Sequence, residues 1–149
     1  MILPALFAAA LSFAGPCSTC RCVVPPPTPQ SALESATAVF TGTVVSIRET
    51  TVSPEPGRWR PARMVGFRVD GVWKGVSAPK VVVLTGMGGG DCGLDFDRGA
   101  RYLVYAHAGA DGKLSTGVCR RTAPAALASE DLRALGNPER RWPRPNVQN

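Results

Sequence analysis

The cysteines have the widest range of chemistry in this sequence, and three of the five fall within residues 17–22, CSTCRC. Cysteines this close together hold zinc, exchange disulfides or cross-link a fold. A redox C-x-x-C pair stands at the N-terminus of a helix, whereas Cys17 and Cys20 precede a proline-rich arm. A zinc site made of the three clustered thiols would take its fourth ligand from Cys92 or His107. The cellular compartment decides among these uses.

The N-terminal segment indicates that compartment. Residues 1–16 carry no charge and contain about a dozen consecutive apolar or small side chains, which is typical of a signal peptide and too short to span a bilayer. A small-x-small site at Ser12–Ala14 predicts a signal peptide over residues 1–14 and Gly15 as the new N-terminus. A buried N-terminal strand or helix, or a start upstream of the first Met, are the alternatives.

Export changes the interpretation of the cysteines, because thiols pair in oxidising compartments. The sequence therefore predicts a secreted protein, extracellular or periplasmic, with structural disulfides. Cys17 is the odd fifth cysteine, and it is free, lipidated or paired with a second chain. After the leader, no segment is long and apolar enough to predict a membrane span.

Two further motifs lack the elements that catalysis would require. Gly88–Gly93 matches G-x-G-x-x-G, but residues 94–106 read as loop and strand where a dinucleotide-binding turn needs a helix. His107 has no partner spaced as in a Ser-His-Asp or Cys-His site. We therefore expect neither enzymatic activity nor a cofactor.

The net charge of +6 reflects two groups of arginines. Arg58, Arg60 and Arg63 form a candidate polyanion patch. The tail, residues 137–149, adds Arg140, Arg141, Trp142 and Arg144. For an exported protein the expected polyanion is a glycan or cell-surface polymer, not nucleic acid. A solvated loop and a loose tail are the alternative.

Short strands separated by turns must position these residues. β-Branched and aromatic side chains predict strands at residues 38–52, 65–73, 80–85, 101–107 and 114–118. The run 80–85 reads as buried on both faces, because it is almost continuously apolar. Residues 53–61 are expected to be a loop, since they contain three prolines and a glycine.

Two short helices flank the predicted strands. The arm at residues 24–30 is rich in proline and should run extended, with a helix at residues 31–37 behind it. Ser129 is the expected N-cap of a last helix that ends at Gly136. The pattern predicts one mainly β domain at residues 15–136, either a barrel or a sandwich.

Several motifs occur in a fixed order along residues 20–119. They are Cys20-Arg21-Cys22 with Pro25, AVFTGTV at 38–44, FRVDGVWKG at 67–75, Cys92-Gly93, Gly99 with Tyr102-Leu103-Val104, and Asp111-Gly112-Lys113-Leu114 leading to Cys119. Together they resemble the inhibitory domain of the tissue inhibitors of metalloproteinases (TIMPs) and related netrin-like modules. The resemblance implies a five-stranded OB-type closed barrel with short flanking helices.

The same resemblance implies two disulfides, Cys20–Cys92 and Cys22–Cys119. It also implies an inhibitory wedge, Cys20-Arg21-Cys22, whose partner is a zinc metalloproteinase. In such a wedge the free α-amine and carbonyl of Cys20 chelate the protease zinc, and the Arg21 side chain enters the specificity pocket. In an extended segment Cys20 and Cys22 point to one side and Arg21 to the other.

Two features differ from the family pattern. Cleavage after Ala14 would leave residues 15–19 in front of Cys20 and block the chelate, and Arg21 replaces a small or hydroxylic residue. The expected function is a secreted metalloendopeptidase inhibitor. The alternatives are a non-inhibitory netrin-like module that binds an extracellular protein or polyanionic glycan, and, third, a zinc or redox protein.

Overall fold

The protein is mainly β, and the computed structural model describes residues 20–144. The predicted signal peptide and Cys17 lie outside the described residues. In chain order the elements are α1 (Pro29–Ser35), β1 (Ala38–Glu55), β2 (Arg58–Lys74), β3 (Lys80–Thr85), η1 (Gly89–Asp91), β4 (Arg101–Ala108), β5 (Leu114–Ser115), η2 (Val118–Arg120), β6 (Ala123–Pro124), η3 (Ala125–Leu127), α2 (Ser129–Leu135) and β7 (Arg140–Arg141).

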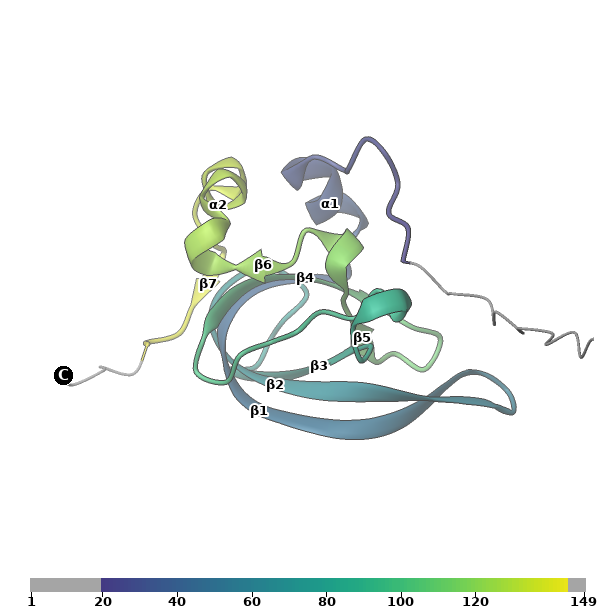
Figure 1. Ribbon diagram of the computed structural model, residues 1–149. Coiled ribbons are helices and arrows are strands. Elements are labelled where there is room, and N and C mark those ends of the chain that lie inside the picture. Colours follow the sequence, from purple (N-terminus) through teal and green to yellow (C-terminus); the bar gives the residue numbers. More distant parts are fainter. Residues whose placement is uncertain (1–19, 145–149) are drawn as a thin grey trace, which may run out of the picture.

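Five strands form a ring-like sheet (Figure 1). β1 pairs with β2 and β4, β2 pairs with β3, and β5 lies between β3 and β4. All these pairings are antiparallel except β3–β5, which is parallel. The pairing of β1 with β4 joins the two ends of the order β1-β2-β3-β5-β4.

An aromatic chain fills the ring. Phe40, Phe67, Phe96 and Tyr102 contact one another in edge-to-face geometry, with ring centroids 4.7–5.5 Å apart. Alternate residues of β2 point into this interior, because every second residue of a strand faces the same side. Val65, Phe67 and Val69 are each fully buried.

A second apolar layer lies between the sheet and the two helices. Trp73, Leu103 and Tyr105 pack there against small side chains of α1 and of the residue before α2. Figure 1 shows both helices on one side of the sheet, next to β4 and β6, and the helices also contact each other. The Nζ atom of Lys74 donates to the carbonyls of Leu33 and Glu34, at 3.1 and 2.8 Å, and so fixes the end of α1.

The expected loop at residues 53–61 is wrong. β1 and β2 continue beyond the ring as a hairpin that closes at Glu55 and Arg58. Gly57 has a φ of +78°, which permits the tight turn. Pro54 lies in an irregularity of the ladder between Val52 and Glu55, where its missing N–H costs no hydrogen bond.

Three strand and helix details also differ from the expectations. β3 is not buried on both faces, since Val83 is fully buried while Val82 is 52% exposed. The fifth strand ends at Ser115, Thr116 and Gly117 of the predicted 114–118 strand belong to no element, and Val118 begins η2. Ser129 is the first helical residue of α2, and Ala128 occupies the N-cap without a side-chain hydrogen bond.

Helix α1 begins two residues earlier than expected. Pro29 occupies its first turn, where a proline lacks only an N–H that would be unpaired anyway. Thr28 is the N-cap, and its Oγ1 atom accepts a hydrogen bond from the Ser31 amide. The last proline of the arm therefore starts the helix.

The part of the tail that the structure describes is not loose. The amide of Glu139 donates to the Val72 carbonyl at 2.8 Å, and that of Trp142 donates to the Asp70 carbonyl at 3.0 Å. β7 pairs with β2, and the Trp142 ring packs against the inner core. Among residues 20–144, no helix has the length and hydrophobicity needed to cross a membrane.

Candidate functional site

The Cys20–Cys22 segment is joined to two loops by adjacent disulfides. The structure pairs Cys20 with Cys92 and Cys22 with Cys119, as the resemblance implies, with Cα–Cα distances of 5.0 and 5.2 Å. The Sγ atoms of Cys20 and Cys119 lie 3.7 Å apart, so the two cross-links are in contact. The segment is therefore anchored at two closely spaced cysteines.

The glycine-rich loop is shaped to present Cys92. The Asp91 carboxylate accepts hydrogen bonds from the amides of Met87, Gly88 and Gly93, at 2.7–3.0 Å. Although desolvation acts to raise it, these three donors hold the pKa of Asp91 below its ordinary value. A Cβ atom at Gly93 would collide with the backbone of Gly86.

This loop also contacts the loop of the second disulfide. The amide of Val118 donates to the Cys92 carbonyl at 3.0 Å. The G-x-G-x-x-G pattern thus belongs to a loop that supports a disulfide, and the residues after it form no helix before β4.

The segment and the start of the arm are exposed. Arg21 and Cys22 are exposed, and the side chains that follow, Val23 and Val24, are 73% and 91% exposed. Val118, which precedes the partner of Cys22, is 46% exposed. Apolar groups beside an exposed cation form a surface suited to contact with another protein. We call Arg21, Cys22, Val23 and Val24 the N-terminal ridge.

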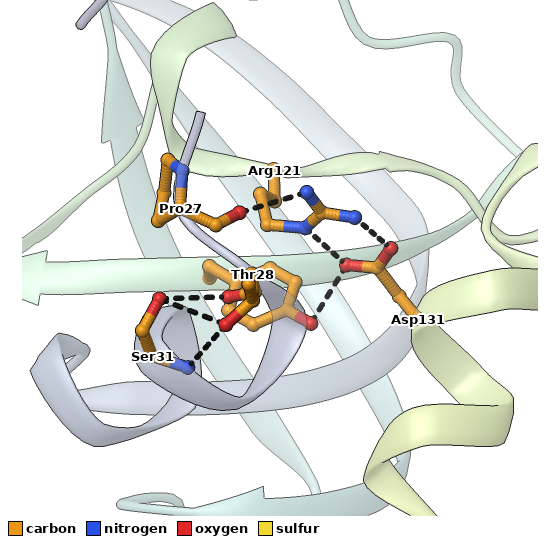
Figure 2. Close-up of polar contacts among 6 residues, drawn as sticks. Pro27, Thr28, Ser31, Arg121 and Asp131 are labelled. Atoms are coloured by element: carbon orange, nitrogen blue, oxygen red, sulfur yellow. Dashed lines mark hydrogen bonds and ion pairs between the residues drawn. The ribbon is translucent and has the colours of Figure 1, made fainter. Parts of the chain in front are cut away.

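The other end of the arm is fixed at helix α1. The Thr28 carbonyl accepts a hydrogen bond from the Ala32 amide at 2.9 Å, and the side chains of Thr28 and Ser31 bond to each other at 3.1 Å (Figure 2). The N-terminal ridge is consequently held between two cross-links and a capped helix.

The candidate polyanion patch does not form one free cationic surface. Arg58 pairs with Glu55 at 3.2 Å, and Arg63 pairs with Asp95. By strand alternation Arg58 and Arg60 share one face of β2, whereas Arg63 points to the opposite face.

A cleft of about 600 Å³ lies between the distal hairpin, the end of β3 and the turn before β5. Trp59 and Arg60 line one wall, and Asp111 and Lys113 line another. Trp59 is 69% exposed. Sequence reasoning missed this cleft, because it depends on the hairpin that was expected to be an irregular loop.

The sulfur cluster is not a thiolate site in this structure. The Sγ atoms of Cys20, Cys92 and Cys119 lie within 4.8 Å of one another, but all three belong to disulfides. His107 is not part of this cluster. Burial, together with the positive charges of Arg120 and Lys74, lowers the pKa of His107.

No family model matches the chain, and no curated protein matches it. The likeness to the inhibitors therefore rests on the motifs of residues 20–119.

Proposed function

We propose that the protein is an exported inhibitor of zinc metalloendopeptidases and that Cys20-Arg21-Cys22 is its wedge. The observation that carries this proposal is the N-terminal ridge itself. It is exposed, it belongs to no strand in the described chain, and two touching disulfides anchor it. Preorganised, exposed segments of this kind bind with little entropic cost.

The strand order supports assigning the sheet to the OB-type barrels. An OB fold is a five-stranded Greek-key barrel, and the order β1-β2-β3-β5-β4 with β1 against β4 agrees with that topology. Fold alone does not carry function, so the inhibitory role rests on the ridge.

The chemistry requires a free amine on Cys20. A catalytic zinc site keeps one coordination position for water or substrate, and an amine and a carbonyl from one residue would occupy it. An α-amine has a pKa of about 8, so the protease zinc competes with its proton at neutral pH, whereas an amide nitrogen is a poor ligand. The zinc belongs to the protease, and this chain supplies only main-chain atoms.

The first experiment determines the N-terminus of the exported protein. The inhibitory role requires that intact-mass analysis and N-terminal sequencing of secreted material find Cys20 as the first residue, five residues beyond the Gly15 terminus that the leader alone predicts. The same material should inhibit zinc endopeptidases in a titration. If residues 15–19 remain in front of Cys20, the zinc-chelating role is excluded for that form.

A second candidate function, a non-inhibitory netrin-like module for a protein or polyanionic glycan, is favoured by the cleft beside Trp59. An exposed indole next to arginine provides both stacking and charge for such a ligand. Heparin-column retention of a variant with Arg58, Arg60 and Arg63 all changed to Ala tests it. Unchanged retention would count against the arginine patch, and Trp59→Ala tests the cleft separately.

A further inference from the structure

Arg121 connects the proline-rich arm to the interior of the protein. Its Nη1 atom donates to the Pro27 carbonyl at 2.9 Å. The other side of the guanidinium faces the Asp131 carboxylate, with Nε donating to it at 2.8 Å and Nη2 forming a second bond (Figure 2). One planar group thus joins the arm to helix α2.

The carboxylate that holds Arg121 is itself fixed. Asp131 is only 6% exposed, and it accepts a third hydrogen bond, from the hydroxyl of the fully buried Tyr105 at 2.8 Å. Burial acts to raise the pKa of Asp131, but the hydrogen bonds from Arg121 and Tyr105 prevail and lower it. Asp131 is therefore a stable anion at neutral pH.

The position of Arg121 in the chain is also constrained. It follows η2 directly, two residues after Cys119, and its backbone has a φ of +59°. A non-glycine residue in this region is uncommon. The same short segment thus provides Cys119 for the N-terminal side of the arm and Arg121 for its far end.

The arm has little else to define its path. In the described part of the chain, the bond from Arg121 is the one hydrogen bond made to residues 21–27. Four of the residues from 24 to 29 are prolines, which donate no backbone hydrogen bond. The disulfides fix the arm at Cys22, and the α1 cap fixes it at Thr28.

We propose that Arg121 is a positioning residue for the N-terminal ridge and that Asp131 and Tyr105 act through it. The inference rests on the proposed inhibitory function, since it assigns the support of that site. Arginine suits the role because its planar fork bonds to a carboxylate with two nitrogens and leaves a third donor for the Pro27 carbonyl. A lysine in its place would keep the charge but lose this geometry.

The experiment compares four variants of the full mature chain. Arg121→Ala removes the link, Arg121→Lys keeps only its charge, and Tyr105→Phe loosens Asp131 without emptying the core. Arg133→Ala is the matched control, because Arg133 is an exposed arginine on α2 whose side chain forms no hydrogen bond or ion pair within the described residues. Mass analysis verifies both disulfides in every variant.

Backbone ¹⁵N order parameters of Val23 and Val24 are the direct measurement. We expect about 0.85 in the wild type and the control, and below about 0.6 in Arg121→Ala and Arg121→Lys, with Tyr105→Phe between them. In the Arg121 variants, inhibition should weaken about tenfold if the N-terminal ridge adopts its binding conformation one tenth of the time. If Arg121 only stabilised the fold, its substitution would lower the unfolding temperature without changing the order parameters of Val23 and Val24.

The outcomes separate the two proposals. Rigid Val23 and Val24 amides in both Arg121 variants would overturn the positioning role. Should Arg121→Ala not fold, Arg121→Lys and Tyr105→Phe supply the same comparison. Lower order parameters of Val23 and Val24 in the Arg121 variants would support the positioning role by themselves. If the wild type inhibits no zinc endopeptidase, the proposed function is contradicted, whatever the order parameters show.

Discussion

At the scale of single residues, Arg21 would determine which proteases the proposed wedge fits. Its side chain is exposed, and alternation along an extended segment directs it away from the disulfide-bonded cysteines that flank it. Binding in an apolar pocket would desolvate the guanidinium without a partner, which costs several kcal/mol. The proposed wedge therefore suits a pocket that contains an acidic group.

We expect Arg21→Thr to improve inhibition of a zinc endopeptidase with an apolar pocket by at least about tenfold, since it removes that desolvation cost. Inhibition constants for the wild type and the variant are the measurement. Arg48→Thr, which changes an exposed arginine of β1, is the matched control and should have no effect. Equal inhibition by the wild type and the Arg21→Thr variant would show that this side chain does not enter the pocket.

Two buried aspartates should make stability depend on pH in acid. Desolvation acts to raise the pKa of both carboxyls, but hydrogen bonds prevail and lower it. The donors are Arg101 and Thr41 for Asp70, and Arg121 and Tyr105 for Asp131. A carboxyl whose pKa is lowered in the folded state stabilises the protein above the unfolded pKa, about 3.9, and this contribution is lost as pH falls through the folded value.

In denaturant unfolding, the free energy of unfolding should thus stay constant above about pH 5 and decrease as the pH is lowered below about 4. Asp131→Asn should flatten part of this slope and destabilise the protein at pH 7 by about 3 kcal/mol, because it leaves Arg121 without its anion. Glu49→Gln, at an exposed residue of β1 that forms no ion pair in the described residues, is the control and should leave the slope nearly unchanged. A wild-type slope preserved in Asp131→Asn would contradict this account.

These ion pairs could not be predicted from the sequence. Asp70 and Arg101 are 31 residues apart and lie on different strands, so no local spacing marks them as partners. Asp131 sits in an ordinary first turn of a helix, where an acidic residue is expected whether or not it is buried. Only the packing of α2 against β4 reveals its role.

At the scale of elements, the spacing of apolar residues predicted strands correctly where one face of the strand is buried. The predicted strand at 80–85 matches β3, and alternation along β2 correctly puts Val65, Phe67 and Val69 on the inward face. The alternation fails beyond an irregularity of the ladder near Val69 and Gly71, where Val72 enters the inner core and Trp73 packs in the layer under the helices. Prolines and glycines misled at residues 53–61, because a paired strand tolerates proline at an irregularity of its ladder. The tail lacked any periodic pattern, since it is held by one apolar side chain, Trp142, and by main-chain hydrogen bonds to β2.

Trp142 should accordingly contribute to stability although it lies in a segment expected to be loose. Trp142→Ala removes a half-buried indole from the core and should lower the free energy of unfolding by about 2 kcal/mol. Trp59→Ala removes an indole that is 69% exposed and should change it by less than about 0.5 kcal/mol. Equal effects in urea unfolding would mean that the tail does not pack in solution.

At the scale of the whole molecule, the same four cysteines build the fold and the candidate site. The disulfides span 72 and 97 residues and join the start of the described chain to the loops that follow β3 and β5. The chain-entropy model assigns each about 4 to 5 kcal/mol of stability. Cysteine spacing alone left metal, redox and structural roles open, and the motif resemblance supplied the pairing that the structure contains.

The central claim is that the free amine of Cys20, held by the first disulfide, binds a protease zinc. Its most direct test compares one chain that begins at Cys20 with the same chain acetylated on that amine, titrated against the same zinc endopeptidase. We expect tight inhibition by the free form and a loss of at least about a hundredfold on acetylation, since an amide nitrogen is a poor zinc ligand. Equal inhibition by both forms, or by neither, would contradict the claim.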